Sequence, residues 1–128
     1  MLKGIKGKRV LITGASGGIG SSTTYLFAEY GAIVGIHYNK SRNKADQIVQ
    51  KIEKNGGCGA LFKSDLMVDS PEDMVDSFIN MFGKIDILIN NAGAVIGPKD
   101  ILDLDGESWD RTFLLNTKAP FFIAQSAF

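Results

Sequence analysis

Short apolar runs alternate along the chain with longer segments whose apolar residues recur at helical spacing. The runs are rich in β-branched residues and predict strands over residues 9–13, 32–38, 58–64 and 85–90. Because the runs are short and mostly apolar, we expect these strands to be buried on both faces. Strands that alternate with helices are typical of βαβ units, so the pattern predicts an α/β fold with a parallel sheet.

Helical spacing of apolar residues predicts helices over about residues 19–30, 45–52, 71–82 and 107–128. The third helix has the clearest start, because Ser70 is a favoured N-cap residue and Pro71 suits the first helical position. The fourth has no residue that would end it before the last position of the sequence. Its aromatic residues are expected to pack, some of them against another subunit.

Composition restricts the function more than it identifies it. The 128 residues fit one domain, and 14 basic against 14 acidic residues create no overall field that would attract nucleic acid or an anionic membrane. A single cysteine, Cys58, and a single histidine, His37, predict neither an internal disulfide nor a metal site. No signal peptide or membrane span is evident, and we expect a cytoplasmic protein.

A glycine-rich segment directly follows the first predicted strand and opens the first predicted helix. Residues 13–20 read Thr-Gly-Ala-Ser-Gly-Gly-Ile-Gly. Glycines here allow the backbone to approach a pyrophosphate, and the helix N-terminus offers N–H groups and partial positive charge. The segment therefore predicts a phosphate-binding loop, with a glycine-rich turn that binds nothing as the alternative. No Gly-Lys-Ser/Thr occurs, which excludes a Walker-type loop.

The spacing of this segment, T-G-x-x-x-G-x-G, is followed by further landmarks in order: Asp65-Leu66, then Asn90-Asn91-Ala92-Gly93, then Asn116. Together they resemble the short-chain dehydrogenase/reductase family, in particular its 3-oxoacyl-carrier-protein reductases and glucose dehydrogenases. The resemblance covers essentially all of the sequence but only about half of a family domain. It implies an incomplete Rossmann-type doubly wound parallel sheet with strand order 3-2-1-4, in one NAD(P)-binding domain over residues 1–128.

The resemblance also implies roles for individual residues. Asp65 would contact the adenine, although it could instead cap the next turn. We expect a structural role for Asn90 and a ribose-proximal contact for Asn91. Asn116 matches an asparagine whose backbone holds a water in the family's proton relay. Pro120 lacks an N–H, so the Asn116 carbonyl loses its usual helical partner; a simple helix kink is the alternative.

Cofactor choice in dinucleotide-binding folds depends on the end of the second strand, where an acidic residue favours NAD. Here the sequence reads Tyr38-Asn39-Lys40-Ser41-Arg42, with two cations and no carboxylate. We therefore predict NADP(H) over NAD(H), although many NADP-binding relatives carry arginine at the position of Gly17. The complete predicted cofactor set is Thr13, Gly14, Ser16, Gly17, Gly18, Ile19, Gly20, Tyr38, Asn39, Lys40, Ser41, Arg42, Asp65, Leu66, Asn91, Ala92 and Gly93.

The family's catalytic serine and its Tyr-x-x-x-Lys pair are absent from these 128 residues. The sequence therefore predicts the cofactor-binding part of an oxidoreductase acting on a carbonyl or alcohol, with Asn116 as its only relay residue and no activity of its own. An inert nucleotide-binding module is the alternative, and the glycine spacing disfavours a methyltransferase. An uncovered fourth strand at the sheet edge predicts self-association.

Overall fold

The computed structural model describes residues 3–98 and 100–128, and its centre is a four-stranded parallel sheet. The strands are β1 (Arg9–Ile12), β2 (Ile33–Tyr38), β3 (Cys58–Lys63) and β4 (Ile87–Ile89). They lie in the order β3-β2-β1-β4, with β1 hydrogen-bonded to both β2 and β4. This confirms the predicted Rossmann-type order, in which the chain moves outward on one side and then crosses to the other.

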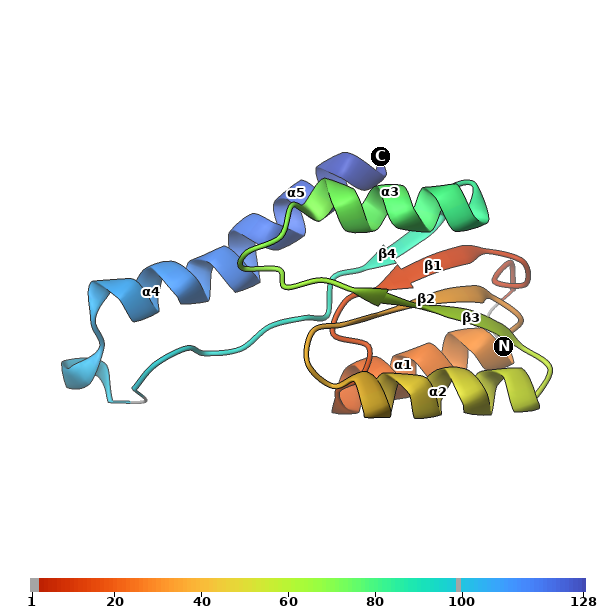
Figure 1. Ribbon diagram of the computed structural model, residues 1–128, viewed down its shortest axis with the longest axis horizontal. Coiled ribbons are helices and arrows are strands. Elements are labelled where there is room, and N and C mark those ends of the chain that lie inside the picture. The colour runs from red at the N-terminus through yellow and green to blue at the C-terminus, as the bar shows by residue number, and fades with distance from the viewer. Residues whose placement is uncertain (1–2, 99) are drawn as a thin grey trace.

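Helices cover both faces of the sheet (Figure 1). One face carries α1 (Gly18–Glu29) and α2 (Arg42–Lys54), and the other carries α3 (Pro71–Phe82) and α5 (Ala119–Ala127). A short 3₁₀ helix (Ile101–Asp103) and α4 (Gly106–Phe113) extend away from the sheet between β4 and α5. The helices begin and end within a few residues of the predicted bounds, except for the fourth.

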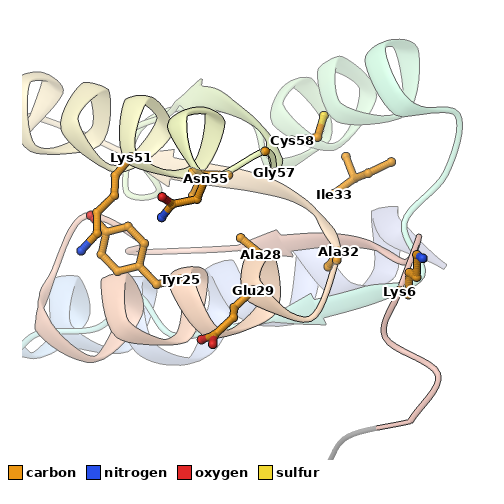
Figure 2. Close-up of a pocket in the computed structure, with 13 residues that line it drawn as sticks. Lys6, Tyr25, Ala28, Glu29, Ala32, Ile33, Lys51, Asn55, Gly57 and Cys58 are labelled. Atoms are coloured by element: carbon orange, nitrogen blue, oxygen red, sulfur yellow. The ribbon is translucent and has the colours of Figure 1, made fainter.

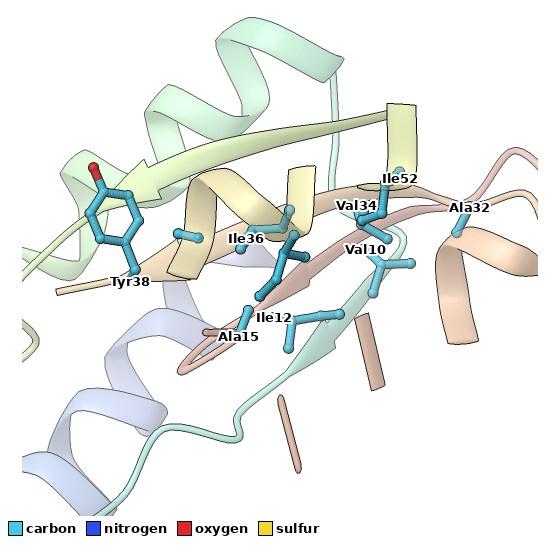
Figure 3. Close-up of a cluster of buried hydrophobic side chains, with 10 residues drawn as sticks. Val10, Ile12, Ala15, Ala32, Val34, Ile36, Tyr38 and Ile52 are labelled. Atoms are coloured by element: carbon cyan, nitrogen blue, oxygen red, sulfur yellow. The ribbon is translucent and has the colours of Figure 1, made fainter. Parts of the chain in front are cut away.

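Two buried clusters hold the layers together, because alternate residues of each strand point to opposite faces. Val10 and Ile12 of β1 lie in the cluster under α1 and α2, which Figure 3 shows together with Val34 and Ile36 of β2. Leu11 points the other way, into the cluster formed with α3 and α5. The central strands are therefore buried on both faces, as their mostly apolar sequences predicted.

The outer strands depart from that prediction. All three residues of β4 are only partly buried, and β3 begins at Cys58, whose side chain is exposed. Each outer strand has one neighbouring strand instead of two, and the helices pack mainly over β1 and β2. The outer strands are therefore less covered than the central ones. The prediction from mostly apolar sequence therefore overestimated the burial of the edge strands.

The predicted fourth helix is interrupted. Between α4 and α5 the backbone forms a π-helix over Leu114–Lys118, in which the Ala119 N–H donates to the Leu114 carbonyl five residues earlier. Pro120 follows immediately and cannot donate a backbone hydrogen bond. The aromatic residues of this region that were expected to pack are exposed: Trp109, Phe113, Phe121, Phe122 and Phe128.

No helix within residues 3–98 and 100–128 is both long and apolar enough to cross a membrane.

Candidate functional site

The glycine loop joins the end of β1 to the start of α1, and its shape depends on two glycines. Gly14 has a φ of +61°, and a Cβ there would lie 2.9 Å from the Ala92 Cα. A Cβ on Gly20 would collide with the Gly14 carbonyl oxygen, so α1 can approach the loop only without a side chain at this position. No side chain caps α1 at Gly17, which leaves the N–H groups of its first turn for solvent or a ligand.

Thr13 and Asn91 lock the loop to the end of β4. The Thr13 hydroxyl oxygen accepts hydrogen bonds from the backbone N–H groups of Asn91 and Ala92, each at 3.0 Å. In return, the Asn91 side-chain amide donates to the carbonyls of Thr13, at 3.0 Å, and Gly14, at 3.1 Å. Thr13 is almost fully buried, so it shapes the loop from behind. Because the side-chain nitrogen of Asn91 is occupied, the predicted contact with the ribose would have to use the side-chain oxygen of Asn91 or a neighbouring residue.

His37, to which the sequence assigned no role, lies on the other side of the loop. The Gly14 N–H donates to His37 Nδ1 at 2.9 Å, and the Ala15 N–H donates to the His37 carbonyl at 3.0 Å. The ring is 3% exposed, and burial lowers the pKa of His37, partly offset by the nearby Ser64 carbonyl. The loop therefore rests on β2 through a neutral imidazole.

A hollow of about 630 Å³ opens beside the loop at the carboxyl edge of the sheet, where open α/β sheets bind ligands. Every residue of the predicted cofactor set lines it except Thr13 and Arg42. The hollow also includes residues that the sequence did not single out as binding residues: His37, Ser64, Met67 and Leu115. The spacing of apolar residues could not predict that these four residues line the hollow, because their position depends on how neighbouring strands end at one edge of the sheet.

The end of β2 presents fewer available cations than the sequence suggested. Arg42 Nη1 donates to the Tyr38 hydroxyl at 2.8 Å, and its Nε lies 3.1 Å from an Asp46 carboxylate oxygen. The Tyr38 hydroxyl and then the Asp46 carboxylate raise the pKa of Arg42. Lys40 is exposed and lines the hollow. The expectation of two cations without a carboxylate therefore overlooked Asp46, although an opposite charge four residues later on a helix is a recognisable pair.

Asp65 caps the next turn, which was the alternative to its predicted contact with the adenine. Its Oδ1 accepts from the Met67 N–H at 3.0 Å, and its carbonyl accepts from Val68 and Asp69, so the residue does cap the next turn. It also lines the hollow. A carboxylate has acceptor sites beyond one hydrogen bond, so capping leaves room for a contact with an amino group.

Asn116 lies in the π-helix and clamps the segment after β4. Its side-chain amide donates to the carbonyls of Ala94, at 2.6 Å, and Thr112, at 2.7 Å, while Oδ1 accepts from the Ala94 N–H at 3.2 Å. The side chain is thus engaged, which leaves the backbone for the predicted relay. Asn90 donates to the Pro120 carbonyl at 3.3 Å, a contact of the structural kind expected for it.

A second hollow, of about 740 Å³, lies at the opposite end of the strands between α1 and α2 (Figure 2). Lys51 extends over the Tyr25 ring there, with its nitrogen 4.5 Å from the ring centroid. None of the predicted site residues lines it. Within residues 3–98 and 100–128, no group of three or more histidine, cysteine or acidic side chains is placed to hold a metal ion.

Comparison with known proteins decides the family, since the short chain dehydrogenase model matches residues 8–128. The chain belongs to the short-chain dehydrogenase family. A hydroxynaphthalene reductase-like protein, Arp2 of Metarhizium guizhouense, is 36% identical over an alignment of 128 residues, which covers 98% of this chain and 47% of the fungal protein. The chain spans about half the length of the curated relatives it matches.

Two solved structures have the same fold as this chain. The NADH-dependent reductase A1-R′ in complex with NAD has a TM-score of 0.87 and 34% identity, and the match covers 96% of this chain and 52% of that one. A blue fluorescent protein from a metagenomic library, in complex with NADPH, has a TM-score of 0.88 and 30% identity over 98% and 51%. The family match excludes the methyltransferase alternative. The finer likeness to 3-oxoacyl-carrier-protein reductases stays a prediction.

Proposed function

We propose that residues 1–128 form the dinucleotide-binding part of a short-chain dehydrogenase, that the cofactor is NADP(H), and that the complete protein reduces a carbonyl or oxidises an alcohol. The observation that carries this is the hollow at the carboxyl edge of the sheet, which gathers the glycine loop, the end of β2, Asp65 and Asn91. Its volume of about 630 Å³ lies in the usual range for small-molecule sites.

The loop fits a pyrophosphate. The uncapped N-terminus of α1 offers N–H groups and partial positive charge to an anion. A Cβ built on Gly18 would meet no atom within 4 Å, so a side chain there would project into open space beside the loop. Gly18 lines the hollow, and its lack of a side chain leaves that space for a ligand.

The preference for NADP(H) rests on the end of β2, where a 2′-phosphate would approach Lys40. Among the residues that the structure describes, the only acidic residue that lines the hollow is Asp65, in the segment that follows β3. Arg42 can contribute only if it leaves Asp46, and that ion pair is exposed and therefore weak. Because relatives in complex with NAD and with NADPH both share this fold, binding must be compared directly.

The nicotinamide, when bound, supplies or accepts the hydride. This chain's contribution is to bind and orient the dinucleotide through the glycine loop and, at Asn116, to hold a relay water on the backbone. A general acid typically contributes roughly 10²–10⁴-fold to such a reaction, and no Tyr-x-x-x-Lys pair stands in this sequence to provide one. We therefore expect the 128-residue chain to bind cofactor without turnover.

Binding is tested by titrating the chain with NADPH and NADH over a series of salt concentrations. We expect tighter NADPH binding that weakens with salt, because the 2′-phosphate contact is ionic. Lys40→Ala should reduce that preference, whereas Asp46→Asn should increase it by releasing Arg42. Equal or tighter NADH binding would refute the NADP(H) preference, and no binding of either would refute the site.

Activity is tested with NADPH and a panel of ketones, 3-oxoacyl thioesters and sugars, first with this chain and then with the chain joined to a family C-terminal half. Turnover only in the extended form supports the oxidoreductase function. Turnover by the 128-residue chain would require an acid other than the family's tyrosine. Cofactor binding with no activity in either form would favour the inert nucleotide-binding module.

A further inference from the structure

His37 is the only histidine of the sequence, and its ring is buried between two parts of the proposed cofactor site. It occupies the last-but-one position of β2, between the glycine loop on the β1 side and the end of β3. Ser64, which its ring contacts, immediately precedes Asp65. The imidazole therefore joins the loop proposed to hold phosphate to the segment proposed to meet the adenine.

The contacts of the ring define its protonation state. Nδ1 lies 2.9 Å from the Gly14 N–H, which can only donate, so Nδ1 must be an unprotonated acceptor. Nε2 lies 2.9 Å from the Ser64 carbonyl, which can only accept, so Nε2 must carry the proton. The structure accommodates only the neutral Nε2–H tautomer. A second proton on Nδ1 would face the Gly14 N–H and remove its acceptor.

Both backbone groups of Gly14 are hydrogen-bonded. Its N–H is bound by His37, while its carbonyl accepts from the Asn91 side chain at 3.1 Å and from the Gly17 N–H at 3.2 Å. The same carbonyl faces Gly20 so closely that a Cβ would collide with it. A change in the backbone conformation of Gly14 would therefore disturb the start of α1, where the N–H groups of the site originate.

We propose that His37, as the neutral Nε2–H tautomer, is a positioning residue that fixes the Gly14 peptide and thereby holds the glycine loop in its cofactor-binding shape. The proposal rests on the proposed dinucleotide site. His37 acts through Gly14 and Ser64 and needs no contact with the reacting atoms. The shape of the loop should also depend on pH, because protonation of His37 at Nδ1 removes the hydrogen bond that fixes the loop.

The surroundings of the ring favour the neutral form at physiological pH. The glycine loop and residues 91–93 contain no titratable side chain, and the titratable side chains that line the hollow with His37 are Tyr38, Lys40 and Asp65. Burial is the main cause that lowers the pKa of His37 from its ordinary value of 6.5. Cofactor affinity should therefore be constant near neutrality and decrease in acid as the ring gains its second proton.

Two substitutions separate hydrogen bonding from titration. His37→Gln can present an acceptor and a donor on one amide but does not titrate. His37→Leu has neither and leaves the partly buried Gly14 N–H without its partner. Val34→Ala, on the same strand and fully buried, is the matched control for general loss of stability, because Val34 packs in the core away from the loop. All four proteins are compared while folded, as verified by circular dichroism.

The dissociation constant of NADPH is measured from about pH 8 to about pH 5, through the range in which histidine titrates. His37→Leu should bind at least about tenfold more weakly at neutral pH, because the Gly14 N–H loses its acceptor and the loop is no longer fixed in its binding shape. His37→Gln should bind nearly as well as the wild type but without the acid-dependent loss. Val34→Ala should keep the wild-type pH profile. Normal binding by His37→Leu, or the same acid dependence in His37→Gln, would overturn the proposal.

Nuclear magnetic resonance of the cofactor-free chain gives an independent test. Imidazole ¹⁵N spectra should show one protonated nitrogen, Nε2, and the Gly14 amide should exchange faster in His37→Leu than in Val34→Ala. A ring protonated at Nδ1, or unchanged Gly14 exchange, would refute the positioning role. If the wild type binds no dinucleotide while these two signals are as expected, the proposed function fails and the loop-positioning role of His37 stands.

Discussion

Replacement of Gly20 by alanine is the sharpest test of how the glycine loop is built. A Cβ at Gly20 would overlap the Gly14 carbonyl oxygen and lie 2.6 Å from the Asn91 Nδ2. These two atoms are the acceptor and donor of one of the hydrogen bonds that lock the loop. Neither can move freely, because the Ala15 N–H in the same peptide unit as the Gly14 carbonyl donates to the His37 carbonyl, and the Asn91 amide also binds Thr13.

The free-energy cost follows from these contacts. An added methyl group in a well-packed position costs about 1–3 kcal/mol, and loss of the Asn91–Gly14 hydrogen bond about 1 kcal/mol more. Alanine also gains about 1 kcal/mol in helix propensity over glycine. Gly18→Ala is the matched control, because it shares that gain within the first turn of α1 and its Cβ meets nothing within 4 Å. Gly20→Ala should therefore be about 2–4 kcal/mol less stable than Gly18→Ala.

The assay is urea unfolding of the two variants and the wild type, followed by far-ultraviolet circular dichroism. The urea midpoint should decrease for Gly20→Ala and stay level or increase for Gly18→Ala, with similar slopes for all three proteins. NADPH titration adds a second contrast, because Gly18→Ala should weaken binding while leaving the fold intact. Equal midpoints for the two variants would show that the loop and α1 are not packed as described.

Three further predictions follow from other contacts. The pKa of Asp86 is lowered by the Arg9 backbone N–H and then by Lys84. Asp86 should therefore stabilise the fold above its ordinary pKa of 3.8 and lose this effect as the pH falls. In thermal melts over a pH series, Asp86→Asn should lack this loss of stability in acid. Asn116→Ala should cost about 1–3 kcal/mol and speed hydrogen exchange at the Ala94 amide, which loses its acceptor. Exposed aromatic residues on α4 and α5 should make the chain self-associate, and a monomer at all concentrations in sedimentation would contradict this.

The sheet and the place of the site could be predicted because they depend on local patterns. Apolar runs define the central strands, and the glycine loop stands directly between a strand and a helix. Parallel strands end at a common edge, so Asp65 and Asn91 had to lie near the loop once the strand order was known. Local sequence and topology together were sufficient for these conclusions.

The hydrogen bonds that stiffen the site could not be predicted in the same way. His37 meets Gly14 across 23 residues, and Asn91 meets Thr13 across 78. Nothing in the local sequence distinguishes an imidazole that holds a loop from one that merely fills a core. The Arg42–Asp46 pair differs, because its spacing of four residues on a helix was visible and the interaction was overlooked.

The π-helix at Asn116 shows how one local signal and one distant contact produce a single feature. Pro120 removes a backbone donor, which the sequence revealed, but a missing donor alone is equally consistent with a kink or a helix end. The structure adds contacts from outside the helix: Asn116 binds both backbone groups of Ala94, and the Asn90 side chain binds the Pro120 carbonyl. These contacts hold the turn beside the Asn91–Gly93 segment, at the end of β4. Asn116, the residue predicted to orient a relay water, is therefore fixed to the same strand end that locks the glycine loop. A displacement of Asn116 should consequently shift the glycine loop, and a displacement of the loop should shift Asn116.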